Sequence, residues 1–127
     1  MNEITLTILG GRRGSSGTGY GSFAVMVGSA KTITHVEFGS GMTPHEAEYD
    51  ILITALRSLK RQGSVSHLSL IIKSSSKLVV NQLSGQWKVS APSLSTRRER
   101  VFDLLNEAAD YSIQLVPRTA IEHLLTR

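Results

Sequence analysis

The sequence predicts an α/β domain whose elements follow the order β-β-β-α-β-α-α-β-α. Residues 3–9 alternate apolar and polar side chains, which is typical of a strand with one buried face. Residues 43–63 carry apolar side chains at helical spacing, and residues 67–73 form the short apolar run of a central strand. Because no repeat, low-complexity tract or linker interrupts the chain, we expect residues 1–127 to form a single domain.

Between the first two predicted strands lies a glycine-rich segment, residues 10–19. It is not a Walker motif, because no Gly-Lys-Ser/Thr follows, and we interpret it mainly as a long turn between paired strands. Residues 20–27 and 32–38 then indicate a hairpin around a Gly-Ser-Ala-Lys turn.

The helix predicted over residues 43–63 has clear end signals. Thr43 suits the N-cap, Pro44 suits the first helical position, and Gly63 ends the helix. Its apolar stripe consists of Ala47, Ile51, Ala55 and Leu59.

The rest of the chain is predicted to alternate helices with one strand. A short helix begins with capping serines and ends at Gly85, and a loop follows. The expected elements are a helix over 74–85, a loop over 86–95, a helix over 95–110 that turns Val101, Leu104, Leu105 and Ala108 inward, a strand over 111–117 and a helix over 118–127.

Composition narrows the function classes. The chain has no cysteine, which excludes disulfides and zinc-thiolate sites, and its four widely spaced histidines form no HxxxH pair. No apolar run approaches the roughly 20 residues of a membrane span, and the N-terminus lacks a secretory pattern. We therefore expect a cytoplasmic protein without a membrane partner. The formal charge of +4 favours an anionic partner such as nucleic acid.

Four motifs in this order resemble the ribonuclease HI family, most of all its compact bacterial and retroelement forms. They are GGRRGSSGTGYGSF, GSGMTPHEAEYDILITAL, SSSKLVVNQLSGQWKV and LVPR. The resemblance implies the ribonuclease H-like α/β fold, a five-stranded mixed sheet with three antiparallel strands first, flanked by helices. It also implies two-metal hydrolysis of the RNA strand of an RNA/DNA hybrid, with four carboxylates holding two magnesium ions.

Only one of these four carboxylates is present. The resemblance places the ligands at Leu9, Glu48, Ser75 and Leu125. One carboxylate offsets one of the four metal charges, so we expect no stable two-metal site and no cofactor. Magnesium or manganese would be needed only if the chain were nevertheless an enzyme. We interpret Glu48 as a remnant ligand, its alternative being a solvated helix residue, and expect Leu9 to pack locally.

The resemblance and the residue chemistry also give candidate nucleic-acid contacts. Some of these candidates have a purely structural alternative. Ser75 could be only an N-cap, Arg12 and Arg13 could be solvated residues of a turn, and Trp87 could be an anchor at the edge of the core. The region of Trp87 and Lys88 matches one that touches the DNA strand, and Arg97, Arg98 and Arg100 give a predicted helix a basic edge. The candidate contacts are Gly10, Arg12, Arg13, Ser15, Thr43, His45, Ser75, Trp87 and Lys88.

Three functions fit these observations. We favour a catalytically degenerate ribonuclease HI-like domain that binds an RNA/DNA hybrid or double-stranded RNA, or serves as a scaffold, without two-metal cleavage. The alternative is a residual hybrid endoribonuclease, or one with rearranged ligands, built around Glu48. The third is an interaction module, including a homo-oligomer, that no longer binds nucleic acid.

Overall fold

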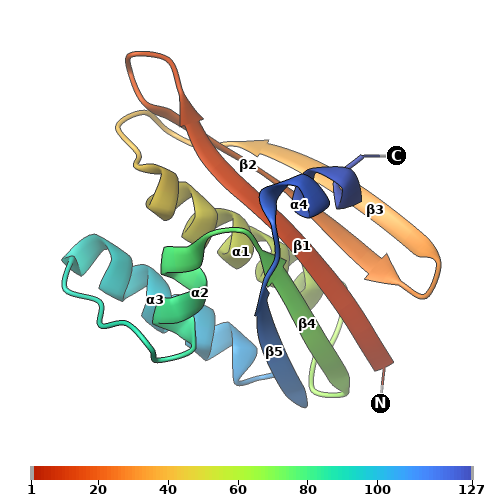
Figure 1. Cartoon of the computed structure of the whole chain (residues 1–127). Coiled ribbons are helices and arrows are strands. Elements are labelled where there is room, and N and C mark those ends of the chain that lie inside the picture. The colour runs from red at the N-terminus through yellow and green to blue at the C-terminus, as the bar shows by residue number, and fades with distance from the viewer. Residues whose placement is uncertain (1, 127) are drawn as a thin grey trace.

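A computed structural model describes residues 2–126 and shows one mixed sheet with helices on both faces (Figure 1). The strand order is β3-β2-β1-β4-β5; β1, β2 and β3 are antiparallel, and β4 and β5 run parallel to β1. The predicted element order and fold class are confirmed. The elements are β1 (Asn2–Arg13), β2 (Thr18–Val27), β3 (Ala30–Glu37), α1 (Pro44–Arg61), β4 (Leu68–Ser74), α2 (Lys77–Leu83), α3 (Pro92–Leu105), β5 (Asp110–Leu115) and α4 (Arg118–Leu124).

The glycine-rich segment is mostly strand, so its interpretation as a long turn is wrong. β1 continues to Arg13 and β2 starts at Thr18, because the backbone groups of Gly10, Gly11, Gly19 and Gly21 take part in the ladder between the two strands. The turn itself is short. It spans residues 14–17, and both of its glycines have positive φ, +75° at Gly14 and +67° at Gly17.

Two glycines of this hairpin let α1 lie directly on the sheet. A Cβ atom at Gly10 would come within 2.5 Å of the backbone of Ala47, and one at Gly21 within 2.7 Å of Ile51. These two glycines are register partners on the same face of β1 and β2. The close approach brings the N-terminal half of α1, and Glu48 with it, against the C-terminal half of β1.

The main core lies between the sheet and α1, with α2 and α3 packed around that helix. The predicted stripe of α1 is buried as expected, and α1 is buried on further sides because α3 covers it. The opposite face of the sheet is covered by α4, whose Ile121 is buried (Figure 1). Among residues 2–126, no helix has the length and apolar character needed to cross a membrane.

The helix predicted over residues 95–110 begins and ends earlier than expected, as α3. Pro92 stands at its first turn, where the missing N–H costs nothing, so the predicted loop ends at Ala91. Val101 and Leu105 are buried as predicted, whereas Leu104 and Ala108 are only half-buried.

The basic edge predicted on α3 is largely used within the fold. Arg97 contacts acidic residues of α1. Arg98 donates to the carbonyl of Gln82 at 3.0 Å and lies over the Phe102 ring. Arg100 is exposed and lines a cavity of about 520 Å³ between α1 and α3.

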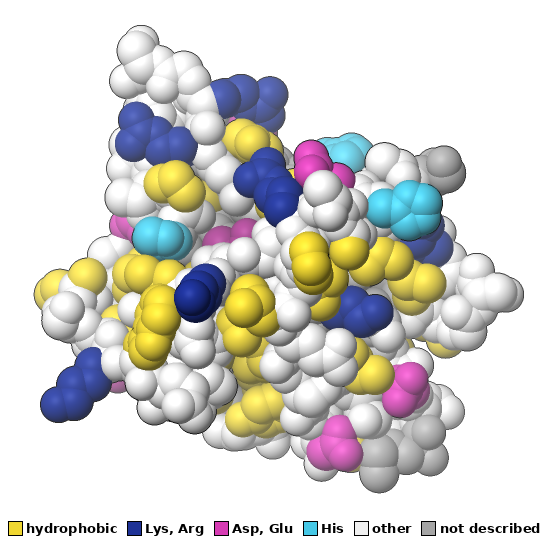
Figure 2. All heavy atoms as spheres, in the orientation of Figure 1, with side chains coloured by type: hydrophobic (Ala, Val, Ile, Leu, Met, Phe, Trp, Pro, Cys, Tyr) yellow, Lys and Arg dark blue, Asp and Glu magenta, His cyan; other side chains and the backbone are white. Residues whose placement is uncertain are grey.

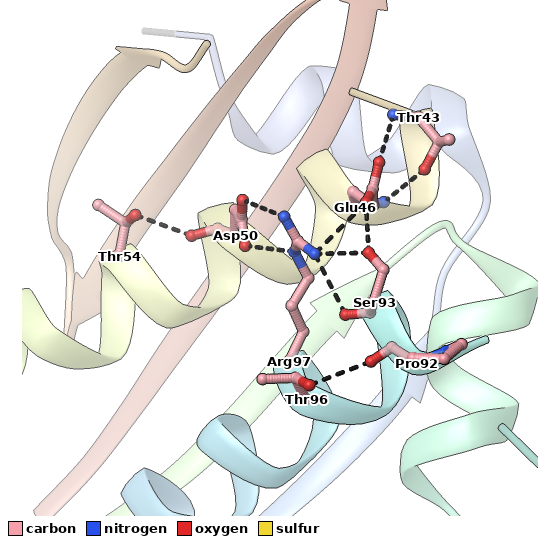
Figure 3. A network of polar contacts seen from close by, with 8 residues as sticks. All are labelled: Thr43, Glu46, Asp50, Thr54, Pro92, Ser93, Thr96 and Arg97. Carbon is pink, nitrogen blue, oxygen red and sulfur yellow. Dashed lines mark hydrogen bonds and ion pairs between the residues drawn. The ribbon is translucent and has the colours of Figure 1, made fainter. Parts of the chain in front are cut away.

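Arg97 joins the N-terminal turns of α1 and α3 (Figure 3). Its Nε donates to Asp50 at 2.8 Å, and its Nη1 lies 3.4 Å from the Glu46 carboxylate. Glu46 also completes a capping box with Thr43 and accepts a hydrogen bond from Ser93. The Ser93 hydroxyl is the main cause that holds the pKa of Glu46 below its usual value.

We expect Arg97→Ala to lower the free energy of unfolding by about 1–2 kcal/mol, because a half-buried arginine loses two carboxylate partners. The control is Lys60→Ala, which removes an exposed pair with Glu107 and should cost less than about 0.5 kcal/mol. Urea denaturation measures both. Equal losses for the two variants would contradict the assignment of Arg97 as the α1–α3 link.

Candidate functional site

A cavity of about 210 Å³ opens where β1, the start of α1, the β4–α2 connection and the start of α4 meet. It brings together five residues that the sequence singled out from separate motifs. Three others line it as well. The predicted residues are Leu9, Gly10, His45, Glu48 and Ser75, and the additional ones are Pro44, Ser76 and Arg118.

Glu48 is buried, with 3% of its surface exposed, so the alternative of a solvated helix residue is wrong. Its Oε1 accepts a hydrogen bond from the backbone N–H of Gly10 at 2.6 Å. Its Oε2 accepts one from the Ser74 hydroxyl at 2.5 Å, and that hydroxyl in turn accepts from the N–H of Ser76 at 3.1 Å. One carboxylate therefore ties α1 to β1 and to the end of β4.

Burial raises the pKa of Glu48 above its usual value, against the smaller lowering effects of its two hydrogen bonds and the nearby Arg118. A carboxyl whose pKa is raised on folding contributes most stability at low pH, below its unfolded value. That contribution is lost as the pH rises from the unfolded pKa through the folded one.

Two Glu48 variants should separate the contribution of its hydrogen bonds from the contribution of its raised pKa. We expect Glu48→Ala to lower the free energy of unfolding by about 2–4 kcal/mol, because it leaves buried donors unpaired and opens a void. Glu48→Gln, which keeps an acceptor and the volume, should cost less than Glu48→Ala. Relative to Glu48→Gln, the wild type should be most stable at low pH and lose that advantage as the pH rises above the ordinary range of a carboxyl. Denaturation at a series of pH values tests this, and an opposite slope would contradict it.

The donor set of the cavity does not fit two magnesium ions. Glu48 is engaged on both oxygens, Leu9 offers only carbon, and Arg118 adds a positive charge beside the carboxylate. No group of three His, Cys, Asp or Glu side chains suited to a metal occurs among residues 2–126. Leu125, the fourth ligand position, is half-buried at the C-cap of α4 and does not line the cavity. The residue of α4 that lines the cavity is its first one, Arg118.

Among the other predicted contacts, Thr43, Trp87 and Lys88 do not line this cavity. The N-cap of α2 is Ser76, so the N-cap alternative for Ser75 is wrong and Ser75 is a half-buried wall residue. Thr43 uses its hydroxyl as the N-cap of α1. Trp87 is 43% exposed on the α2–α3 connection, next to exposed Lys88, so it is not anchored in the core.

The arginines of the β1–β2 hairpin lie on opposite faces of β1, since strand side chains alternate. Arg13 lies over the ring of Tyr20, with its guanidinium carbon 4.5 Å from the ring centre. Arg12 lies beside Gly17, and Ser15 is exposed in the turn. Figure 2 shows basic side chains gathered over this hairpin.

Two residues near the carboxylate, Ser74 and Arg118, were not predicted as site residues from the sequence. The alternation in β4 carried a signal for the first, because Leu68, Leu70 and Ile72 are buried and Ser74 continues their face. Arg118 follows directly on a strand-ending Val-Pro, which places it at the same edge of the sheet as the end of β4. A polar residue in a buried register and a cation at a strand end were the available clues.

Comparison with known proteins identifies the family. Residues 13–123 match the family model described as reverse transcriptase-like. Ribonuclease HI of Halobacterium salinarum is 38% identical over 80 residues, which are 63% of this chain and 39% of that protein. The crystal structure of ribonuclease H1 from the same archaeon has a TM-score of 0.85 at 30% identity, covering 94% of this chain and 89% of the other.

A further solved structure shares the fold at lower identity. LC11-RNase H1, solved in complex with an RNA/DNA hybrid, has a TM-score of 0.80 at 23% identity, covering 94% of this chain and 89% of that one. The family model, the archaeal relative and the sheet order agree, and the chain therefore belongs to the reverse transcriptase-like family as a ribonuclease H-like domain.

Proposed function

We propose that this domain binds an RNA/DNA hybrid or double-stranded RNA on the face of the cavity and does not cleave it by the two-metal route. The observation that carries the proposal is the makeup of the cavity. The two ligand positions that line it beside Glu48 hold Leu9 and Ser75, and Arg118 stands with them. With one carboxylate beside one guanidinium, the cavity lacks the negative charge that two divalent cations require, and its guanidinium suits a phosphate.

The cavity offers hydrogen-bond donors where the family would offer metal ions. Ser75 contributes a hydroxyl, His45 an imidazole and Arg118 a guanidinium, which suits phosphate oxygens. Glu48 is buried and accepts hydrogen bonds from Gly10 and Ser74, so its carboxylate is directed at these two donors. The phosphate would therefore be held by direct contacts to the protein.

Three further observations support nucleic acid as the ligand. Trp87 and Lys88 are exposed together, which suits sugar or base stacking beside phosphate neutralisation. The net charge of +4 gives attraction at longer range. LC11-RNase H1, which shares the fold, was solved with an RNA/DNA hybrid.

The test is a combined binding and cleavage assay. We expect a hybrid labelled on its RNA strand to bind with an affinity that falls as salt rises, because phosphate contacts release counterions. We expect no cleavage with magnesium or manganese. Glu48→Gln serves as the control for the remnant ligand.

Each other outcome identifies another function. Metal-dependent cutting that Glu48→Gln abolishes would overturn the proposal in favour of a residual or rearranged hybrid endoribonuclease. Absence of salt-sensitive binding to hybrid and to double-stranded RNA would overturn it in favour of a scaffold or interaction module.

A further inference from the structure

A stacked pair of side chains stands on the outer face of the β1–β2 hairpin. A Cβ atom at Gly11 would lie 2.8 Å from the Tyr20 hydroxyl, so the absence of a side chain there lets the tyrosine lie over β1. The Arg13 guanidinium lies over that ring, 4.5 Å from its centre. The ring restricts the arginine, so less entropy is lost when its planar fork binds a ligand.

A second polar pair lies on the neighbouring strands of the same face. Ser22 on β2 is hydrogen-bonded to Nδ1 of His35 on β3, 2.6 Å away. With Nδ1 engaged, a ligand would meet this ring through Nε2. Both pairs line one cavity of about 340 Å³, whose polar side chains are those of Arg13, Tyr20, Ser22, His35 and Glu37.

This second cavity adjoins the first one. Leu9, which lines the Glu48 cavity, is the register partner of Ser22, which lines the second. Gly11 follows Leu9 by two residues on the same face of β1, a rise of about 7 Å. A strand of nucleic acid seated at the first cavity therefore reaches the second within a nucleotide or two.

We propose that the second cavity is a nucleotide subsite in which Arg13, positioned by Tyr20, holds a backbone phosphate adjacent to the one at the Glu48 cavity. Ser22 and His35 contact the sugar or base of that nucleotide. Glu37 confines the phosphate to the Arg13 side, because its carboxylate repels an anion. This inference rests on the proposed nucleic-acid binding and adds where a further nucleotide sits.

The stacking of Arg13 on Tyr20 predicts an effect of substitution that surface charge alone does not predict. A lysine at position 13 would keep the positive charge but lose the planar fork that lies on the ring. If Arg13 acts only as one of many surface charges, Arg13→Lys will bind nucleic acid as the wild type does. If the stacked guanidinium is the binding group, lysine will fail much as alanine does.

The experiment measures the affinity of the whole chain for a fluorescent RNA/DNA hybrid at fixed salt, with thermal melting to verify folding. We expect Arg13→Ala and Arg13→Lys each to weaken binding about tenfold. Tyr20→Leu should weaken binding similarly, because the ring that positions Arg13 is lost. Tyr20→Phe keeps the ring and should bind as the wild type does. The charge-matched control is Arg57→Ala, an exposed arginine on α1, expected to stay within about twofold.

The outcomes separate this inference from the proposed function. If the wild type binds and Arg13→Lys binds with the same affinity, the subsite alone is overturned. The same holds if Arg13→Ala and Arg57→Ala weaken binding equally. A wild type that binds neither hybrid nor double-stranded RNA overturns the subsite and the proposed function together. If Tyr20→Leu fails to fold, the comparison of Arg13→Lys with Arg13→Ala still decides.

Discussion

Leu9→Asp combined with Ser75→Asp is expected to create a magnesium site in the Glu48 cavity. Both positions line the cavity that Glu48 lines, so the variant would place three carboxylates around one space. Magnesium prefers such hard oxygen ligands and completes its shell with water. The wild type should show no magnesium-dependent stabilisation, because its single cavity carboxylate is engaged by Gly10 and Ser74.

The expected changes in the free energy of unfolding follow from charge repulsion and from mass action. Without metal, the variant should unfold more easily than the wild type, by about 1–3 kcal/mol, because like charges crowd a partly buried space. Magnesium at about a hundred times its dissociation constant would return about 2.7 kcal/mol. Thermal unfolding and calorimetric titration with magnesium chloride measure both effects.

Two controls make the result specific. Leu9→Asn with Ser75→Asn has nearly the same shape without charge and should not respond to magnesium. Adding Glu48→Gln to the aspartate pair should weaken the response. An aspartate pair that ignores magnesium would show that the cavity has lost the geometry as well as the ligands.

Gly10→Ala is expected to have the largest effect on folding. The added Cβ would lie 2.5 Å from the backbone of Ala47 and of Glu48, which no side-chain rotation relieves. Either α1 moves off β1 or the hydrogen bond from Gly10 to Glu48 breaks. We expect a loss of at least about 3 kcal/mol in the free energy of unfolding.

Gly39→Ala is the matched control, because nothing lies within 4 Å of a Cβ placed there. It should change stability by less than about 0.5 kcal/mol. Urea denaturation followed by circular dichroism compares the two variants. Similar stabilities would contradict the close packing of α1 on β1.

The framework could be predicted from the sequence because its signals are local. In α1, Thr43, Pro44 and Glu46 lie within one turn, and together they define the start of the helix without reference to the rest of the fold. The buried stripe that follows needs only helical periodicity. The start of α3 was missed because Pro92 suits a loop and a first helical turn equally well.

The chemistry of the cavity could not be predicted in the same way. The burial of Glu48 depends on Gly10 and on Ser74, which lie far from it in sequence. Whether a charged residue on a helix is solvated or clamped is decided by such distant partners. Leu9 and Ser75, by contrast, were matched to motifs residue by residue, and both line the cavity that Glu48 lines.

The position of Glu48 also bears on the order in which the chain folds. β1 joins β2 through the short turn over residues 14–17, whereas its parallel pairing with β4 closes a loop that contains β2, β3 and α1. Because a longer loop costs more entropy to close, we expect the antiparallel hairpins to form before the parallel half. Glu48 accepts from Gly10 in the early half and from Ser74 in the late one. Glu48 thus joins the two halves of the sheet, and we expect its hydrogen bond with Ser74 to form only when the parallel half pairs.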